Sequence, residues 1–267
     1  MFKKFITVAS SLALSAMCLT GCNQTTTDKE AKKTLDKVTI AEVTHSVFYA
    51  PQYAAVTKGF FEEEGIEVDI INTSGADKTM AALISGEAQV GLMGPEASIY
   101  VYNQGNENYA VNFAQLTKTD GSFIVAREEM PNFTLEDLKG KDILGGRKGG
   151  VPLMTLEYVL KKNGLTIGTN KEAGEVNVRT DVQFGVMAGA FAGGEGDFTT
   201  VFEPTGTQME EEGTGYIVAS VGELSREVAG DVPYTAYSTT KEFMADNEDL
   251  IQRFTNALYK GQQWCKT

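Results

Sequence analysis

The chain has 267 residues and a net charge of −13, which becomes −15 when Lys3 and Lys4 are lost with the leader described below. A surface this acidic repels phosphate backbones and argues against nucleic acid as a partner. A single histidine, His45, argues against a histidine-based metal site or a serine–histidine triad, and none of the three cysteines has a partner in a mature fold. About 230 residues follow the leader and tether, enough for one large domain or two lobes.

The first 22 residues have the pattern of a lipoprotein signal peptide. A basic segment, residues 1–4, precedes an apolar run, residues 5–17, that is shorter than the ~20 residues of a membrane span. Leu19-Thr20-Gly21-Cys22 resembles the lipobox of bacterial lipoproteins, so we expect Cys22 to carry a lipid anchor. A plain signal peptide cut nearby, or a leftover hydrophobic tail, is the alternative. Residues 23–37 are polar and predict a flexible tether.

The next segment alternates between strand and helix patterns. We expect a strand at residues 38–43, a helix from Pro51 to Gly65, a strand at 66–70, a helix at 77–85 and a strand at 89–93. This order predicts a parallel α/β unit, and residues 38–120 are assigned to a first lobe.

The alternation resumes after a crossover. We expect strands at residues 122–126, 143–144, 176–178 and 198–201, and helices at 134–141, 152–163 and 182–192, with a glycine-rich loop at 145–150. Residues 121–215 are assigned to a second lobe. Two further strands, 216–220 and 234–238, are expected to return to the first lobe. The last helix has an apolar face but no clear stop signal, so we expect residues 216–267 to be an incomplete C-terminal part of lobe one.

Four stretches carry a family resemblance: FYAPQYAAVTKGFFEEEGIEVDI, SGEAQVGLMGPE, TLEDLKGK and AGGEGDFTTVFEP. In this order they resemble the SsuA/THI5-like (NMT1-type) substrate-binding proteins. The resemblance implies the type II periplasmic-binding-protein fold, in which two α/β lobes hold a ligand cleft between them. It also implies a protein that captures a small molecule and delivers it to the permease of an ABC transporter. With the lipobox at Cys22, we expect this protein to be lipid-anchored on the extracytoplasmic face of the cell membrane. Family members bind sulfonates, taurine, other small anions or pyrimidine precursors of thiamin.

Ligands of open parallel sheets bind outside the carboxyl ends of the strands, where loops lead into helices. Applied here, together with the resemblance, that rule selects Ser46, Phe48, Tyr49, Gln52, Ser74, Gly75, Asp77, Gly94, Pro95, Glu96, Ser122, Gly149, Gly150, Val151, Phe202 and Glu203. Other roles stay open for several of them. The aromatic residues are also explained by packing between the lobes, the glycine-rich loop by a flexible turn, and Glu203 by a favourable interaction with a helix dipole.

No nucleophile with a base and no metal cluster is apparent, so we expect no catalytic residue, no cofactor and no metal. The yeast branch of the family makes a thiamin pyrimidine with its own histidine and a cysteine-rich motif, and this chain lacks that cysteine cluster. We expect a monomeric solute-binding protein rather than an enzyme or an adhesin. Carboxylates at Asp77, Glu96 and Glu203 favour a thiamin-type aminopyrimidine, whereas Arg147 and Lys148 would suit a sulfonate or another small anion.

Overall fold

The computed structural model describes residues 34–267. The predicted signal peptide, Cys22 and residues 23–33 of the predicted tether lie outside the described residues. Strand β1 (Asp36–Glu42) begins two residues before the expected position, so Asp36 and Lys37 belong to a strand and not to a tether. Within residues 34–267, no helix is both long and apolar enough to cross a membrane.

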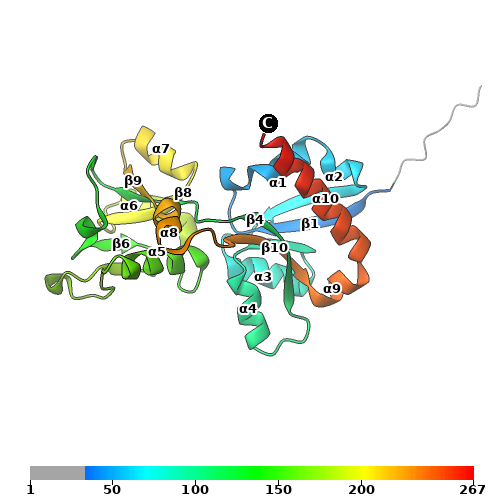
Figure 1. The fold of residues 1–267 in the computed structure, drawn as a ribbon, viewed down its shortest axis with the longest axis horizontal. Helices are drawn as coiled ribbons and strands as arrows, with labels where there is room; N and C mark the ends of the chain where they lie inside the picture. Colours follow the sequence, from blue (N-terminus) through cyan, green and yellow to red (C-terminus); the bar gives the residue numbers. More distant parts are fainter. Residues whose placement is uncertain (1–33) are drawn as a thin grey trace, which may run out of the picture. The chain divides into compact units, whose positions relative to one another are not determined.

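The first lobe is built on a five-stranded sheet with the order β2-β1-β3-β10-β4 (Figure 1). Strands β1, β2 (Ile66–Asn72) and β3 (Val90–Met93) are parallel, which confirms the predicted α/β unit. Strand β10 (Thr235–Thr240) returns from the far end of the chain and pairs antiparallel with β3 and with β4 (Ala110–Thr117). Strand β4 lies in a segment for which the pattern predicted no element.

Helices cover both faces of this sheet. One face carries α1 (Ala50–Thr57), α2 (Phe60–Glu63) and α10 (Glu248–Trp264), whose apolar side chains share a core with β1 and β3. The other face carries α3 (Ala76–Ser85) and α4 (Glu96–Asn103), while α9 (Lys241–Asp246) follows β10 (Figure 1). The single helix expected between Pro51 and Gly65 is two helices, because Gly59 adopts a left-handed conformation with φ of 75° between them.

The second lobe is built on a five-stranded sheet with the order β7-β6-β8-β5-β9. Strand β6 (Asp142–Leu144) is parallel to β7 (Asn177–Arg179) and to β8 (Phe198–Phe202), and β5 (Ser122–Ala126) is antiparallel to β8. Helices α5 (Val151–Lys162), α6 (Met187–Ala192), α7 (Thr205–Glu211) and α8 (Val221–Ala229) surround it. The expected helix at 182–192 begins only at a 3-10 turn, Phe184–Val186, which leaves residues 180–183 as a loop.

Strand β9 (Tyr216–Ser220) corrects the predicted lobe boundary. It pairs antiparallel with β5 in the second sheet and does not return to the first lobe. Helix α8 follows it directly and packs on α5 and β5, so residues 216–229 remain in the second lobe. Only residues 230–234 cross back to β10, and the boundary set at residue 215 was therefore wrong.

The two segments that connect the lobes run beside each other. The carbonyl oxygens of Lys118 and Thr117 accept hydrogen bonds from the N–H groups of Val232 (2.9 Å) and Tyr234 (3.1 Å). Lys118 also forms an ion pair with Asp231, 3.2 Å apart. Two paired crossings limit the lobes to motion about one short region, which is the arrangement of a hinge.

Candidate functional site

A cavity of about 660 Å³ lies between the two lobes, at the carboxyl ends of the parallel strands of both sheets. Its volume falls within the range of small-molecule sites. The expected site residues that line it are Tyr49, Ser74, Gly75, Asp77, Gly94, Glu96, Gly150, Val151 and Phe202. The strand-end rule and the family resemblance together thus selected sixteen residues, and nine of them lie in this wall.

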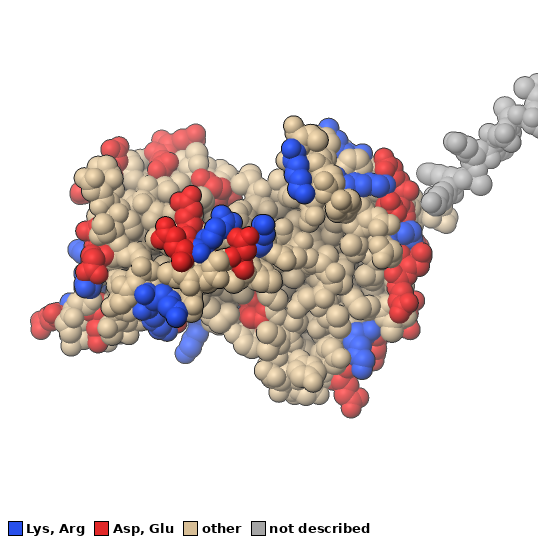
Figure 2. Space-filling model, viewed as in Figure 1, with Lys and Arg blue, Asp and Glu red and all other residues tan. Residues whose placement is uncertain are grey.

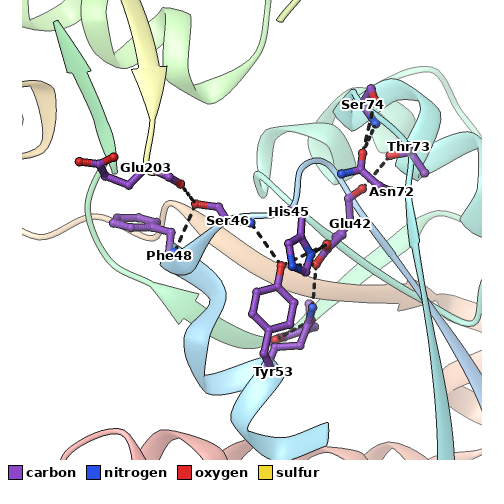
Figure 3. A network of polar contacts seen from close by, with 11 residues as sticks. Glu42, His45, Ser46, Phe48, Tyr53, Asn72, Thr73, Ser74 and Glu203 are labelled. Carbon is purple, nitrogen blue, oxygen red and sulfur yellow. Dashed lines mark hydrogen bonds and ion pairs between the residues drawn. The ribbon is translucent and has the colours of Figure 1, made fainter. Parts of the chain in front are cut away.

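The remaining expected residues lie outside this wall, namely Ser46, Phe48, Gln52, Pro95, Ser122, Gly149 and Glu203. Two of them hold the lobes together. Ser46 Oγ donates a hydrogen bond to the backbone oxygen of Glu203, 2.8 Å away across the cleft (Figure 3). The ring of Phe48 covers Gly121 so closely that a Cβ atom there would overlap it, and it lies 6.4 Å from the ring of Phe202. Phe48 thus packs between the lobes.

The carboxylate of Glu203 is turned toward its own lobe, away from Ser46 (Figure 3). It accepts hydrogen bonds from the N–H (3.0 Å) and the hydroxyl (2.9 Å) of Thr207, in the first turn of α7. Glu203 lines a smaller neighbouring cavity of about 240 Å³ and not the larger one. The geometry therefore gives this carboxylate the helix-start role that the sequence analysis left open.

A buried carboxylate that the sequence analysis did not select, Glu42, ends strand β1 (Figure 3). It accepts hydrogen bonds from Gln52 Nε2 (2.8 Å) and Tyr53 Oη (3.0 Å), and His45 Nδ1 lies 3.0 Å from it. Burial and the charge of Glu42 raise the pKa of Tyr53. Gln52 also accepts from the hydroxyl of Tyr237, 3.0 Å away, so this residue supports β1 and α1 rather than the cavity. The sequence signal was a carboxylate within the mostly apolar run of residues 38–43.

Glu96 is the buried carboxylate that lines the large cavity. Only 8% of the residue is exposed. Its Oε1 atom accepts a hydrogen bond from the N–H of Val151, 3.2 Å away in the other lobe. Its Oε2 atom is buried and has no hydrogen-bond partner among the described residues. Burial raises the pKa of this carboxyl, while backbone N–H groups at the starts of α4 and α5 oppose the shift.

The hinge contributes two more buried polar groups. Asp120 accepts hydrogen bonds from the N–H and the hydroxyl of Ser122, both at 2.6 Å, and burial raises its pKa to about 6. Tyr234 lines the cavity, and its hydroxyl has no hydrogen-bond partner within residues 34–267. Burial, and then the charge of Asp120, raise the pKa of Tyr234. Asp120 lies in a loop with no periodic pattern. Tyr234 begins the strand that was expected at residues 234–238, and that pattern gave no sign of a role at the site.

Charged side chains of both signs surround the cavity. Lys78 and Lys148 line it, and Arg147 of the glycine-rich loop forms an ion pair across the cleft with Asp77. The loop at residues 180–183 adds Asp181 and Gln183, of which only Gln183 was expected to be helical. On the face shown in Figure 2, basic and acidic side chains likewise lie intermixed over both lobes. The site therefore combines donors, acceptors and aromatic rings rather than one dominant charge.

Comparisons with known proteins agree with this architecture. The model of the family described as NMT1/THI5 like matches residues 47–267. The Bacillus subtilis (strain 168) protein YtlA, whose descriptive name calls it a binding protein, is 48% identical over 233 residues, which cover 87% of this chain and 67% of YtlA.

Two solved structures show the same fold. The periplasmic nitrate-binding protein NrtA from Synechocystis PCC 6803 has a TM-score of 0.69 and 17% identity, over 87% of this chain and 63% of that one. The periplasmic aliphatic sulphonate binding protein SsuA from Escherichia coli has a TM-score of 0.64 and 16% identity, over 85% and 72%. The expected periplasmic-binding-protein fold is thereby confirmed.

Proposed function

This chain belongs to the NMT1/THI5-like family, and we propose that it is the solute-binding subunit of an importer of the ABC type. One observation carries the proposal: a cavity of about 660 Å³ is walled by both lobes, and two paired segments form the hinge between them. A small molecule held by both walls would stabilise the lobes against each other. We propose binding and delivery to a permease, without catalysis.

We propose a thiamin-type aminopyrimidine as the ligand. The support is the chemistry of the wall. Glu96 Oε2 is a buried acceptor without a partner among the described residues, and a ring N–H or an amino group would satisfy it with a charge-assisted hydrogen bond. The rings of Tyr49, Phe184, Phe202 and Tyr234 line the same cavity and suit a flat heterocycle.

An aliphatic sulfonate or another small anion is the second candidate. Lys78, Arg147 and Lys148 line the cavity and could pair with a negatively charged group. Arg147 is already paired with Asp77, which lowers the charge that it offers to a ligand. We also propose that Cys22, outside the described residues, anchors the protein by lipid to the extracytoplasmic face of the membrane, and that the protein acts as a monomer.

Calorimetric titration of an aminopyrimidine and of taurine separates the two ligands. We expect the pyrimidine to bind the wild type, and Glu96→Gln to weaken it by about 10- to 100-fold, since a hydrogen bond to a charged group contributes about 1.5–3 kcal/mol. Glu203→Gln and the exposed Glu129→Gln serve as controls and should bind as the wild type does. Tight taurine binding without heat from the pyrimidine would overturn the ligand assignment. Binding of neither compound, nor of any member of a wider solute screen, would overturn solute binding itself.

A further inference from the structure

We propose that the N-terminus of α5 is an anion-binding site that the chain fills with its own carboxylate, Glu96, so that the cleft rejects solutes bearing a negative group at this position. This inference rests on the proposed solute-binding function and adds a residue that determines selectivity. It is argued from the position of the Glu96 side chain between the two lobes.

The side chain of Glu96 accepts a hydrogen bond from the first turn of a helix in the other lobe. Glu96 is the first residue of α4, and its Oε1 atom accepts from the N–H of Val151, the first residue of α5. Helix α5 has no cap of its own, because its N-cap residue is Gly150 and no side chain caps it from within. Pro152, the second helical residue, has no N–H. The carboxylate from the first lobe therefore takes the place that a capping side chain or a bound anion would occupy.

The second oxygen of this carboxylate, Oε2, lies over the backbone of Gly94. Glu96 Oε2 is buried, has no hydrogen-bond partner within residues 34–267, and belongs to a residue that lines the large cavity. The turn before α4 is shaped to this side chain, because a Cβ atom at position 94 would overlap the carboxylate. Because Gly94 has no Cβ atom, the carboxylate of Glu96 can fold back over the turn that precedes α4.

The start of α5 would otherwise attract anions. The N-terminal end of a helix carries partial positive charge, and Arg147 and Lys148 lie in the loop immediately before α5. An incoming sulfonate or carboxylate would meet Glu96 there and would be opposed by like-charge repulsion. Selectivity of this kind depends on repelling the wrong ligand as well as on binding the right one. The fold itself allows anions, as the names of the nitrate- and sulphonate-binding proteins state for those two proteins.

Inorganic sulfate is the probe for this site, used at pH 7.5 and at constant ionic strength with sodium chloride as balance. We expect Glu96→Ala to bind sulfate at least tenfold more tightly than the wild type in calorimetry, with a matching rise in melting temperature. Glu96→Gln, which keeps the shape and removes the charge, should show a smaller gain. The exposed Glu129→Gln is the matched control and should respond to sulfate as the wild type does.

Each outcome decides the proposal. Tight sulfate binding by the wild type, or an equal sulfate response in wild type and both Glu96 variants, would overturn it. If Glu96→Ala does not fold, Glu96→Gln decides: any tightening relative to the wild type supports the proposal, and none overturns it. The sulfate measurement needs no organic solute, so it is independent of the test of the proposed function. If no organic solute binds the wild type, but sulfate binds the Glu96 variants and not the wild type, the proposed function is overturned and this inference stands.

Discussion

Gly94 lies between β3 and α4, where the backbone passes directly under the carboxylate of Glu96. A methyl group at this position would overlap that carboxylate and force it away from Val151. We expect Gly94→Ala to reduce the free energy of unfolding by about 1–3 kcal/mol, the usual effect of overpacking. Urea denaturation measures the change, with the wild type in parallel.

Gly189→Ala is the control for Gly94→Ala. Gly189 lies in α6, is exposed and has no atom within 4 Å of an added Cβ. Alanine there should leave the protein unchanged or stabilise it by about 0.5–1 kcal/mol, since it restricts the unfolded chain. A Gly94→Ala protein as stable as the wild type would contradict the close contact with Glu96.

At the scale of elements, the paired crossing segments contain a carboxyl group that is nearly inaccessible to water. Asp120 is 3% exposed, and its pKa is about 6, above the ~3.9 of an unfolded chain. The folded state therefore binds the proton more tightly than the unfolded state. The stabilising contribution of Asp120 is fully present below about pH 4 and is lost as pH rises to about 6, with a total change of up to about 3 kcal/mol.

The variant Asp120→Asn isolates this contribution. Other carboxylates change the stability of both proteins alike, so we expect the difference in unfolding free energy, variant minus wild type, to increase between pH 4 and pH 7. Urea unfolding at pH 4.5, 5.5 and 7 measures it. Asp69→Asn, at an exposed position on β2, should show no such trend. A difference independent of pH would contradict the raised pKa of Asp120.

For the whole molecule, the attachment to the membrane is the prediction that lies outside the described residues. Two acyl chains on Cys22 would suffice for stable anchoring, where a single chain binds only marginally. We expect Cys22→Ala to accumulate as precursor or to be released into the medium. Cell fractionation and the mass of the mature protein are the measurements. Unchanged membrane retention without lipid mass would refute the anchor.

The positions of residues in the cavity wall were easier to predict from the sequence than the roles of the carboxylates among them. The rule of strand ends selected Asp77, Glu96 and Glu203 together, because all three follow predicted strands. Whether a carboxylate faces a ligand depends on its neighbours in space. Thr207 holds Glu203 at the start of α7, whereas Val151 draws one oxygen of Glu96 across the cleft and leaves the other without a partner among the described residues.

Local periodicity determined the type and order of most elements, since alternation of apolar residues depends on which face of a strand or helix is buried. It also predicted the apolar face of α10, where Ile251, Phe254 and Leu258 are buried. It could not assign β9 to its sheet, because a strand has the same pattern whichever neighbour it pairs with. The path of α8 against α5 and β5 decided that pairing. Tertiary structure likewise decided the burial of Asp120 and Tyr234, whose surroundings come from segments far apart in the chain.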